Sequence, residues 1–315
     1  MSYNLAGLST YTNQQTLPLI TKSLFNARTI SLINKQVGIK YVSSLNLLDT
    51  TTAFSYGNTC GFNGANNTTD FTQRYLTAVH TKVHEAICPK ALEAYWMLTQ
   101  LTAGSMPTTI PFEQVYAEQK VLSIQKALET AVWQGTGADG SITGFASIFN
   151  SASVTDLNAS AYGWTTDLSF ATLRSTPANA IALLNTFETY LSADIKGYDD
   201  VAIFCGVDVF TAIKQGLVAE NYFNISYLNG VENYELTLPG SNIKLYGVNG
   251  LNGTYDLYAG RTSHMVFGTD LLNEEERFEI FYAKEADEVR FVCEFKAGVQ
   301  IAFPDQCARF MMAAS

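Results

Sequence analysis

Apolar side chains recur with a helical period in the middle of the chain. Between Pro111 and Gln134 they follow one another at intervals of four and three residues, at Ala117, Val121, Ile124, Leu128 and Ala131. Charged residues such as Lys120, Lys126 and Glu129 fall outside this stripe, and a proline suits the first turn of a helix. The pattern predicts an amphipathic helix roughly 35 Å long at about 1.5 Å per residue.

The glycines that follow this helix spell a motif of cofactor-binding proteins. Gly135, Gly137 and Gly140 give the pattern G-x-G-x-x-G. A loop that cradles a dinucleotide needs a strand before the glycines and a helix after them. Here a helix precedes them, and Ser141 to Gly144 is typical of a turn. We therefore expect the glycines to end the helix, with positive φ at Gly135 and Gly137, and we expect no bound nucleotide.

Two strand patterns enclose a long polar segment in the first third of the chain. The strands are expected at Lys40 to Leu48 and at Arg74 to Ile87, where apolar residues and threonines share one parity. Between them, Asp49 to Thr72 is rich in Thr and Asn and contains three glycines. The pattern predicts a long two-stranded arm with a flexible tip. Because an isolated hairpin is marginally stable, this arm should lie on another surface.

The second half of the chain begins with mixed helix and strand and ends as strand alone. Thr176 as N-cap and Pro177 in the first turn predict a helix that ends at Lys196-Gly197. The continuously apolar run Val201 to Cys205 predicts a buried strand, and Asp208 to Leu217 a short helix, which together make a small α/β unit. Further strands are expected at Ile243–Val248, Asp256–Ala259, Met265–Gly268, Phe278–Tyr282 and Val289–Phe295, followed by a bend or bulge at Gly298.

Composition favours a folded protein that contacts other subunits. Apolar residues make up 47% of the 315 residues, whereas charged residues make up only 15%, against about 25% in ordinary soluble domains. A surface with so few charges suits extensive neutral contacts. The net charge of −10 and the lack of a Lys/Arg cluster argue against tight nucleic-acid binding. An acidic protein could still enclose DNA, because its surface would not adhere to the phosphates.

The sequence contains no recognisable targeting signal and no cysteine spacing typical of a metal site or a disulfide framework. No run approaches the ~20 apolar residues of a membrane span, and the first residues lack the pattern of a signal peptide, so the cytoplasm is the expected location. The five cysteines contain no C-x-x-C pair and are expected to be free thiols, several of them buried; they are Cys60, Cys88, Cys205, Cys293 and Cys307.

Two groups of residues that contain histidine are candidate sites, and the sequence supports neither of them. His80, His84 and Cys88 would align on a helix, but the alternation around them predicts a strand, on which neighbours in this series lie about 13 Å apart. Ser263 and His264 are adjacent in the sequence, which does not by itself make a catalytic pair, and no G-x-S-x-G elbow occurs.

Two acidic runs are possible cation-binding segments. Their spacing is typical of solvated hairpin ends, at Glu274 to Glu276 and Glu285 to Glu288. We therefore expect no catalytic, cofactor-binding or metal-binding residues and no enzymatic activity.

Two long stretches carry a resemblance to a known family. The first, "EQKVLSIQKALETAVWQGTGADGSITGF", runs from Glu118 to Phe145, and the second, "YAGRTSHMVFGTDLLNEEERFEIFYAKEADEVRFVCEFKAGVQIAFPDQ", from Tyr258 to Gln306. The first resembles the long spine helix, and the second the closing β-strands, of the major capsid protein of tailed bacteriophages. The resemblance implies the α+β fold of this family, the HK-97-like phage capsid fold, over nearly the whole chain.

The resemblance also implies a division into domains. Residues 1–39 would form the N-terminal arm, and residues 40–87 the extended β-hairpin loop that lies on a neighbouring subunit. Residues 88–150 and 258–315 would form the peripheral domain with its spine helix. Residues 151–257 would form the axial domain that gathers in pentamers and hexamers.

The function implied is structural. The chain would self-assemble as a homo-oligomer into the icosahedral capsid that encloses the double-stranded DNA of a tailed phage, with no cofactor and no membrane. Its location would be the virion capsid, assembled in the cytoplasm of the bacterial host, with a portal protein and scaffold or decoration proteins as partners. The alternatives are an encapsulin-like nanocompartment shell and an α/β enzyme that binds a cofactor at Gly135 to Gly140.

Overall fold

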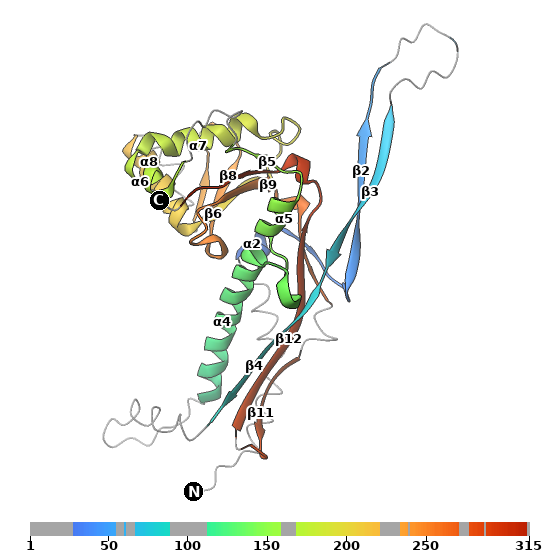
Figure 1. The fold of residues 1–315 in the computed structure, drawn as a ribbon, viewed down its shortest axis with the longest axis vertical. Helices are drawn as coiled ribbons and strands as arrows, with labels where there is room; N and C mark the ends of the chain where they lie inside the picture. Colours follow the sequence, from blue (N-terminus) through green and yellow to red (C-terminus); the bar gives the residue numbers. More distant parts are fainter. Residues whose placement is uncertain are drawn as a thin grey trace.

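The computed structural model describes residues 28–54, 60, 67–88, 112–158, 168–220, 234–238, 240–270, 277–286 and 288–313. Figure 1 shows three regions: a long lower sheet beside a helix, an upper sheet covered by helices, and a two-stranded ribbon that projects away from both. None of the helices in these ranges is long and apolar enough to cross a membrane.

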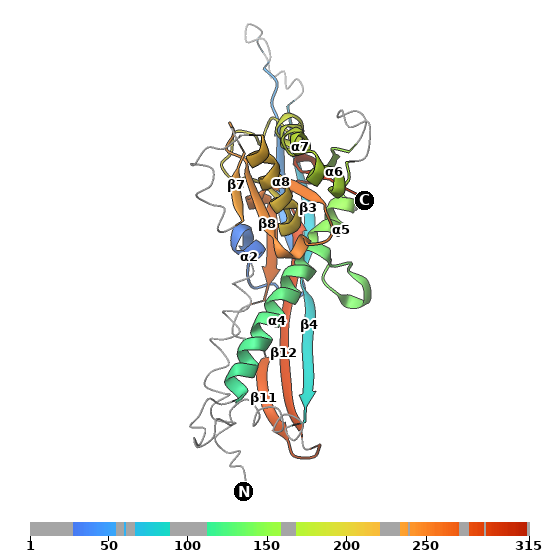
Figure 2. The same ribbon diagram turned by 90° about the vertical axis from the view of Figure 1, so that its left-hand side faces the viewer.

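The lower sheet is built around one long strand, β12 (Glu288–Ile301). One edge of β12 pairs with β4 (Val79–Ile87), and the other pairs with β11 (Arg277–Ala283) and then β10 (Met265–Thr269), all antiparallel. The short strand β1 (Asn34–Gln36) adds to β10 in parallel. The spine helix α4 (Phe112–Gln134) runs lengthwise along this sheet (Figure 2).

The upper sheet has six strands in the order β5, β13, β9, β6, β8 and β7. Their bounds are β5 (Thr155–Asp156), β13 (Ala308–Phe310), β9 (Leu257–Arg261), β6 (Val201–Gly206), β8 (Lys244–Val248) and β7 (Glu235–Thr237). The helices that accompany it are α6 (Phe170–Ser175), α7 (Pro177–Tyr190) and α8 (Val207–Ala219) (Figure 1). Short helical turns are η4 (Asn249–Leu251), η5 (Thr262–His264) and η6 (Pro304–Gln306).

Strand β6 is continuously apolar because both of its faces are buried. Val201, Ile203 and Cys205 point into the core shared with α7 and α8, whereas Ala202 and Phe204 point into the core shared with α4. A strand buried on both faces does not alternate with polar residues. The predicted strand at Val201 to Cys205 and the helix after it are therefore confirmed.

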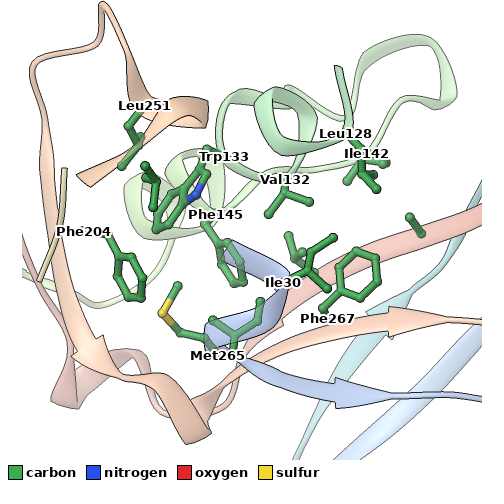
Figure 3. Packing of buried hydrophobic residues seen from close by; sticks show 14 of the residues in the cluster. Ile30, Leu128, Val132, Trp133, Ile142, Phe145, Phe204, Leu251, Met265 and Phe267 are labelled. Carbon is green, nitrogen blue, oxygen red and sulfur yellow. The ribbon is translucent and has the colours of Figure 1, made fainter. Parts of the chain in front are cut away.

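Trp133 lies at the centre of the core beneath the upper sheet (Figure 3). Its ring centroid is 5.3 Å from that of Phe145, at the start of α5 (Phe145–Ser151), and 5.2 Å from that of Phe204. Ile30 of the short helix α2 (Arg28–Leu32) enters the same core and is fully buried. One cluster thus joins α2, α4, α5 and both sheets.

The spine helix and the glycine turn follow the sequence pattern closely. The helix covers the expected range, and its stripe residues Val121, Ile124 and Leu128 are buried. Gly137 adopts the expected positive φ of 74°, in front of the turn η1 (Ala138–Gly140). Gly135 does not have positive φ; a side chain there would overlap the carbonyl oxygen of Ile142. The turn therefore needs glycine at position 135 for close packing.

Two expected features differ from the structure. The helix that begins at Pro177 ends at Tyr190, and the chain reaches Gly197 through turns in which Leu191 and Ile195 are still buried. No bulge interrupts the β10–β12 ladder at Gly298, because the two strands pair in regular register from Ala297 to Ile301.

The largest correction concerns the second flank of the predicted arm. Strand β2 (Val42–Thr51) pairs with β3 (Thr68–Thr77), as expected, through ten residue pairs. After Ala78 the chain leaves the ribbon and enters the lower sheet as β4. The prediction of one strand from Arg74 to Ile87 is therefore wrong beyond Thr77. Both ends of the predicted tip belong to the ribbon strands, at Asp49–Thr51 and at Thr68–Thr72, whereas residues 55–59 and 61–66 lie outside the described residues.

Candidate assembly surface

The ribbon formed by β2 and β3 stands away from the rest of the molecule (Figure 1). Its ten residue pairs span about 30 Å at roughly 3.3 Å per residue. From Leu48 outward on β2, and up to Gln73 on β3, every side chain is exposed on both faces. This part of the ribbon has no core of its own.

One face of the ribbon is apolar, and we call it the apolar ribbon face. Directly paired residues share a face, so Leu48 lies beside Phe71, and Tyr75 lies on the same face nearer the base. Their exposed fractions are 56%, 81% and 60%. Val42, 45% exposed, completes the face. Exposed apolar side chains of this size, although polar pairs separate them along the face, favour an interaction site.

The opposite face changes character along its length. Near the base, Leu76 is buried and Leu45 packs against the same small cluster. Farther out, Asp49 lies directly opposite Asp70. Like charges in this position destabilise a strand pair, so the outer ribbon is held neither by a core nor by favourable cross-strand charge. The arrangement suits a segment that gains its stability from a partner.

His80 and His84 lie on the exposed side of β4, where the strand prediction placed them. Both approach Glu294 of β12: the His84 Nε2 to Oε1 distance is 3.4 Å, and the His80 Nε2 to Oε2 distance is 3.9 Å. Cys88 lies just beyond the end of β4 and is exposed. In the part of the chain that the structure describes, no three His, Cys, Asp or Glu side chains are placed to hold a metal ion.

Ser263 and His264 lie together in η5, but their side chains have different neighbours. The Ser263 hydroxyl donates to Asp200, which also accepts hydrogen bonds from the Arg261 guanidinium at 2.9 and 3.2 Å. Burial opposes ionisation of Asp200, yet these hydrogen bonds lower its pKa. The His264 ring lies 5.0 Å from Phe303, and burial lowers its pKa. No hydrogen bond joins the two side chains in the described structure.

The structure describes both ends of one of the two acidic runs. Glu285 is exposed in the turn between β11 and β12, and Glu288 begins β12, which agrees with a solvated hairpin end. The run Glu274 to Glu276 lies outside the described residues.

Glu129 is the charged residue that the periodicity placed wrongly. Expected on the polar side of the spine helix, it is only 5% exposed, because α2 covers it. The backbone N–H of Thr29 donates to both carboxylate oxygens at 3.3 Å, and the Thr29 hydroxyl also donates to Glu129. Trp133 Nε1 donates in turn to the Thr29 hydroxyl at 2.7 Å. Burial raises the pKa of Glu129 despite these hydrogen bonds.

The class of fold follows from these features: a long helix beside a long sheet, a second sheet with its own helices, and a projecting ribbon define the HK-97-like capsid fold. No family model matches the sequence, and no curated protein matches it. Solved structures do. The chain matches a structure titled "Mycobacterium phage Che8" at a TM-score of 0.56 and 11% identity, over 90% of this chain and 91% of that chain.

Two further structures support the same conclusion. The capsid of an empty GTA particle matches at a TM-score of 0.55 and 10% identity, over 91% of this chain and 90% of that chain. A virus-like particle from Pyrococcus furiosus matches at a TM-score of 0.53 and 9% identity, over 94% and 98%. The α+β capsid fold predicted from the sequence is confirmed.

Proposed function

We propose that this protein is a shell subunit, the major capsid protein of a tailed bacteriophage. The observation that carries the proposal is the apolar ribbon face: in the described part of the chain, the side chains of Leu48, Phe71 and Tyr75 are each more than half exposed on a ribbon that projects from the subunit (Figure 1). In a closed assembly of identical subunits, each ribbon finds a neighbour, and that contact converts exposed apolar area into association free energy. The likeness of nearly the whole chain to capsid structures supports the proposal.

Each region then takes a role in the shell. Residues 1–39 form the N-terminal arm, residues 88–150 and 258–315 the peripheral domain, and residues 151–257 the axial domain at the centre of pentamers and hexamers. We end the extended loop at Thr77 rather than at residue 87, because β4 pairs with β12. The shell encloses double-stranded DNA, is built in the host cytoplasm, and joins a portal protein with scaffold or decoration proteins.

The chain needs no chemistry for this role. The glycine turn that could have held a nucleotide is a tight connection between α4 and α5, with Gly144 against the carbonyl of Trp133. We propose that the subunit is not an enzyme. A panel of nicotinamide and flavin cofactors should cause no thermal shift, whereas a ligand at 100 times its Kd would stabilise the protein by about 2.7 kcal/mol.

Negative-stain electron microscopy of the purified chain tests the proposal. We expect closed uniform shells or rings of five and six subunits. The double variant Leu48→Ser with Phe71→Ser should stay folded and fail to assemble. Asn46→Ser with Gln73→Ser, on the same face of the ribbon, provides a matched control and should assemble normally.

Three outcomes would contradict the proposal. Normal shells from the Leu48→Ser, Phe71→Ser variant would show that the apolar ribbon face is not an assembly surface. A wild-type chain that stays monomeric at every concentration in sedimentation velocity would argue against a self-assembling shell. Particles filled with protein instead of DNA would indicate a nanocompartment.

A further inference from the structure

The ribbon joins the body of the subunit at a single corner. Its last pair is Val42 with Thr77, and the next residue pair along the same chain, Val79 with Ala297, already belongs to the lower sheet. Only Ala78, which is 1% exposed, separates the two ladders. The direction of the ribbon therefore depends on how this corner is held.

Two glycines lie directly beneath the corner. Gly268 of β10 and Gly298 of β12 are paired residues in the antiparallel ladder. A methyl group at Gly268 would lie 2.5 Å from Leu76 Cδ2 and 2.7 Å from Ile39 Cδ1. A methyl group at Gly298 would overlap the carbonyl oxygen of Thr77 and would lie 3.2 Å from Ala78 Cα. Neither glycine has a positive φ, so contact, not backbone conformation, requires glycine at both positions.

Hydrogen bonds fasten the corner around these glycines. The Ala78 N–H donates to the Tyr41 carbonyl at 2.8 Å and closes the base of the ribbon. The Ile39 N–H donates to the Thr269 carbonyl at 3.0 Å, and the Gln300 side-chain amide donates to the Tyr75 carbonyl at 2.7 Å. The segment that leads into β2 is thus tied to β10, and β3 is tied to β12.

The side chains at the corner form a small core of their own. Ile39, Leu76, Ala78 and Val266 are buried together, separate from the two large clusters of the subunit. A change in this small core can therefore alter the attachment of the ribbon while both large cores stay intact. This separation makes the corner testable by substitution.

We propose that Gly268 and Gly298 form a glycine seat that sets the direction in which the ribbon leaves the subunit. The missing side chains allow the corner to lie directly on the sheet, where Leu76 and Ile39 fill the space above Gly268 and the Thr77–Ala78 backbone fills the space above Gly298. This inference rests on the proposed shell function. In the shell, the glycine seat determines where the apolar ribbon face meets a second copy of the chain.

The test measures the ribbon direction in the subunit and the assembly separately. Spin labels at Thr50→Cys on the ribbon and Lys126→Cys on the spine helix, with Cys60→Ser and Cys88→Ser, report the distance between the two regions. We expect Gly268→Ala and Gly298→Ala to shift or broaden this distance and to lose uniform shells. Gly260→Ala in β9, where a methyl group would meet only the Cys307 side chain, should change neither readout.

A second substitution distinguishes the seat from general destabilisation. Leu76→Ala removes the nearer of the two side chains that a methyl group at position 268 would strike, so adding it to Gly268→Ala should bring the label distance back toward the wild-type value, with only Ile39 Cδ1 still in contact at 2.7 Å. The same addition should not rescue Gly298→Ala, because the obstacle there is the Thr77 backbone. If Gly298→Ala does not fold, Gly268→Ala with and without Leu76→Ala still decides the question.

The proposal is overturned if Gly268→Ala leaves the label distance unchanged, or if Leu76→Ala rescues neither the distance nor the shells of that variant. These outcomes differ from failure of the proposed function. A wild-type chain that forms no shells contradicts the shell role, yet the label distance in the subunit still tests the seat.

Discussion

The β2–β3 ribbon and the β4–β12 pair are equally regular ladders with opposite surroundings. The ribbon has ten residue pairs and the β4–β12 ladder has nine. On β12, Phe291, Cys293 and Phe295 are at most 4% exposed beneath the spine helix, whereas Leu48 and Phe71 on the ribbon are more than half exposed. Backbone pairing alone does not distinguish a core strand from an exposed strand, because the difference lies in what packs against the side chains.

The contrast is sharpest because β3 and β4 are nearly one strand. Only Ala78 separates them, and apolar residues occur in both. The difference in burial arises because β4 pairs with β12 in the lower sheet, where Val83 packs against the large core, while β3 extends past the body (Figure 1). Apolar residues on the first half are free to bind a neighbour, and those on the second half stabilise the subunit.

The largest effect should come from a charge in the core that covers the lower sheet. Leu128, 2% exposed, becomes a buried carboxylate in Leu128→Asp, and the cost of several kcal/mol is comparable with the whole free energy of unfolding of a domain. We expect the variant to be unfolded by circular dichroism. Leu122→Asp on the same helix, at a position 58% exposed, should melt like the wild type. A cooperative, wild-type-like transition for Leu128→Asp would show that the stripe is not core.

A pair of aromatic truncations compares the two ladders directly. Phe295→Ala on β12 should lower the free energy of unfolding of the subunit by about 3–5 kcal/mol, because it leaves a cavity. Phe71→Ala on the ribbon should change it by less than about 0.5 kcal/mol and yet impair assembly. Urea unfolding and electron microscopy measure the two effects. Similar stability losses in both variants would refute the division between core and assembly strands.

A smaller, pH-dependent effect is expected at Glu129. Because burial raises its pKa in the folded state, its contribution to stability is fully present below the unfolded pKa and is lost as the pH rises through the folded pKa. The stability of wild type relative to Glu129→Gln should therefore decrease from mildly acidic toward neutral pH. Urea unfolding across that range measures the difference, and a difference that grows with pH would contradict the assignment.

The smallest perturbation uses the native thiols. Cys60, beyond the ribbon, and Cys88 are exposed, whereas Cys205, Cys293 and Cys307 are buried. Burial raises the pKa of the Cys307 thiol to about 12, which disfavours the reactive thiolate. A colorimetric thiol reagent should therefore modify two cysteines quickly in the native subunit and the other three only after denaturation. Rapid modification of all five would show that the cores open readily.

The sequence by itself determined the elements with strong periodicity. The spine helix, the apolar strand β6 with α8, and the β11–β12 hairpin all lie close to their predicted positions, because their side-chain patterns record which face is buried. The low content of charged residues also indicated contacts with other subunits. The ribbon was predicted as a hairpin, and its need for a partner followed from the absence of a core.

Only the tertiary structure decided the features that depend on contacts between distant segments. Glu129 is buried because Thr29, a hundred residues earlier, lies over it. His80 and His84 share Glu294 because of the strand register, which no local spacing records. Gly298 interrupts an apolar pattern in the sequence, yet strand β12 continues through it. Glycine is needed there because the Thr77–Ala78 backbone lies against this position. A local pattern specifies a buried face, whereas the partner that buries it is chosen by the packing of the whole chain.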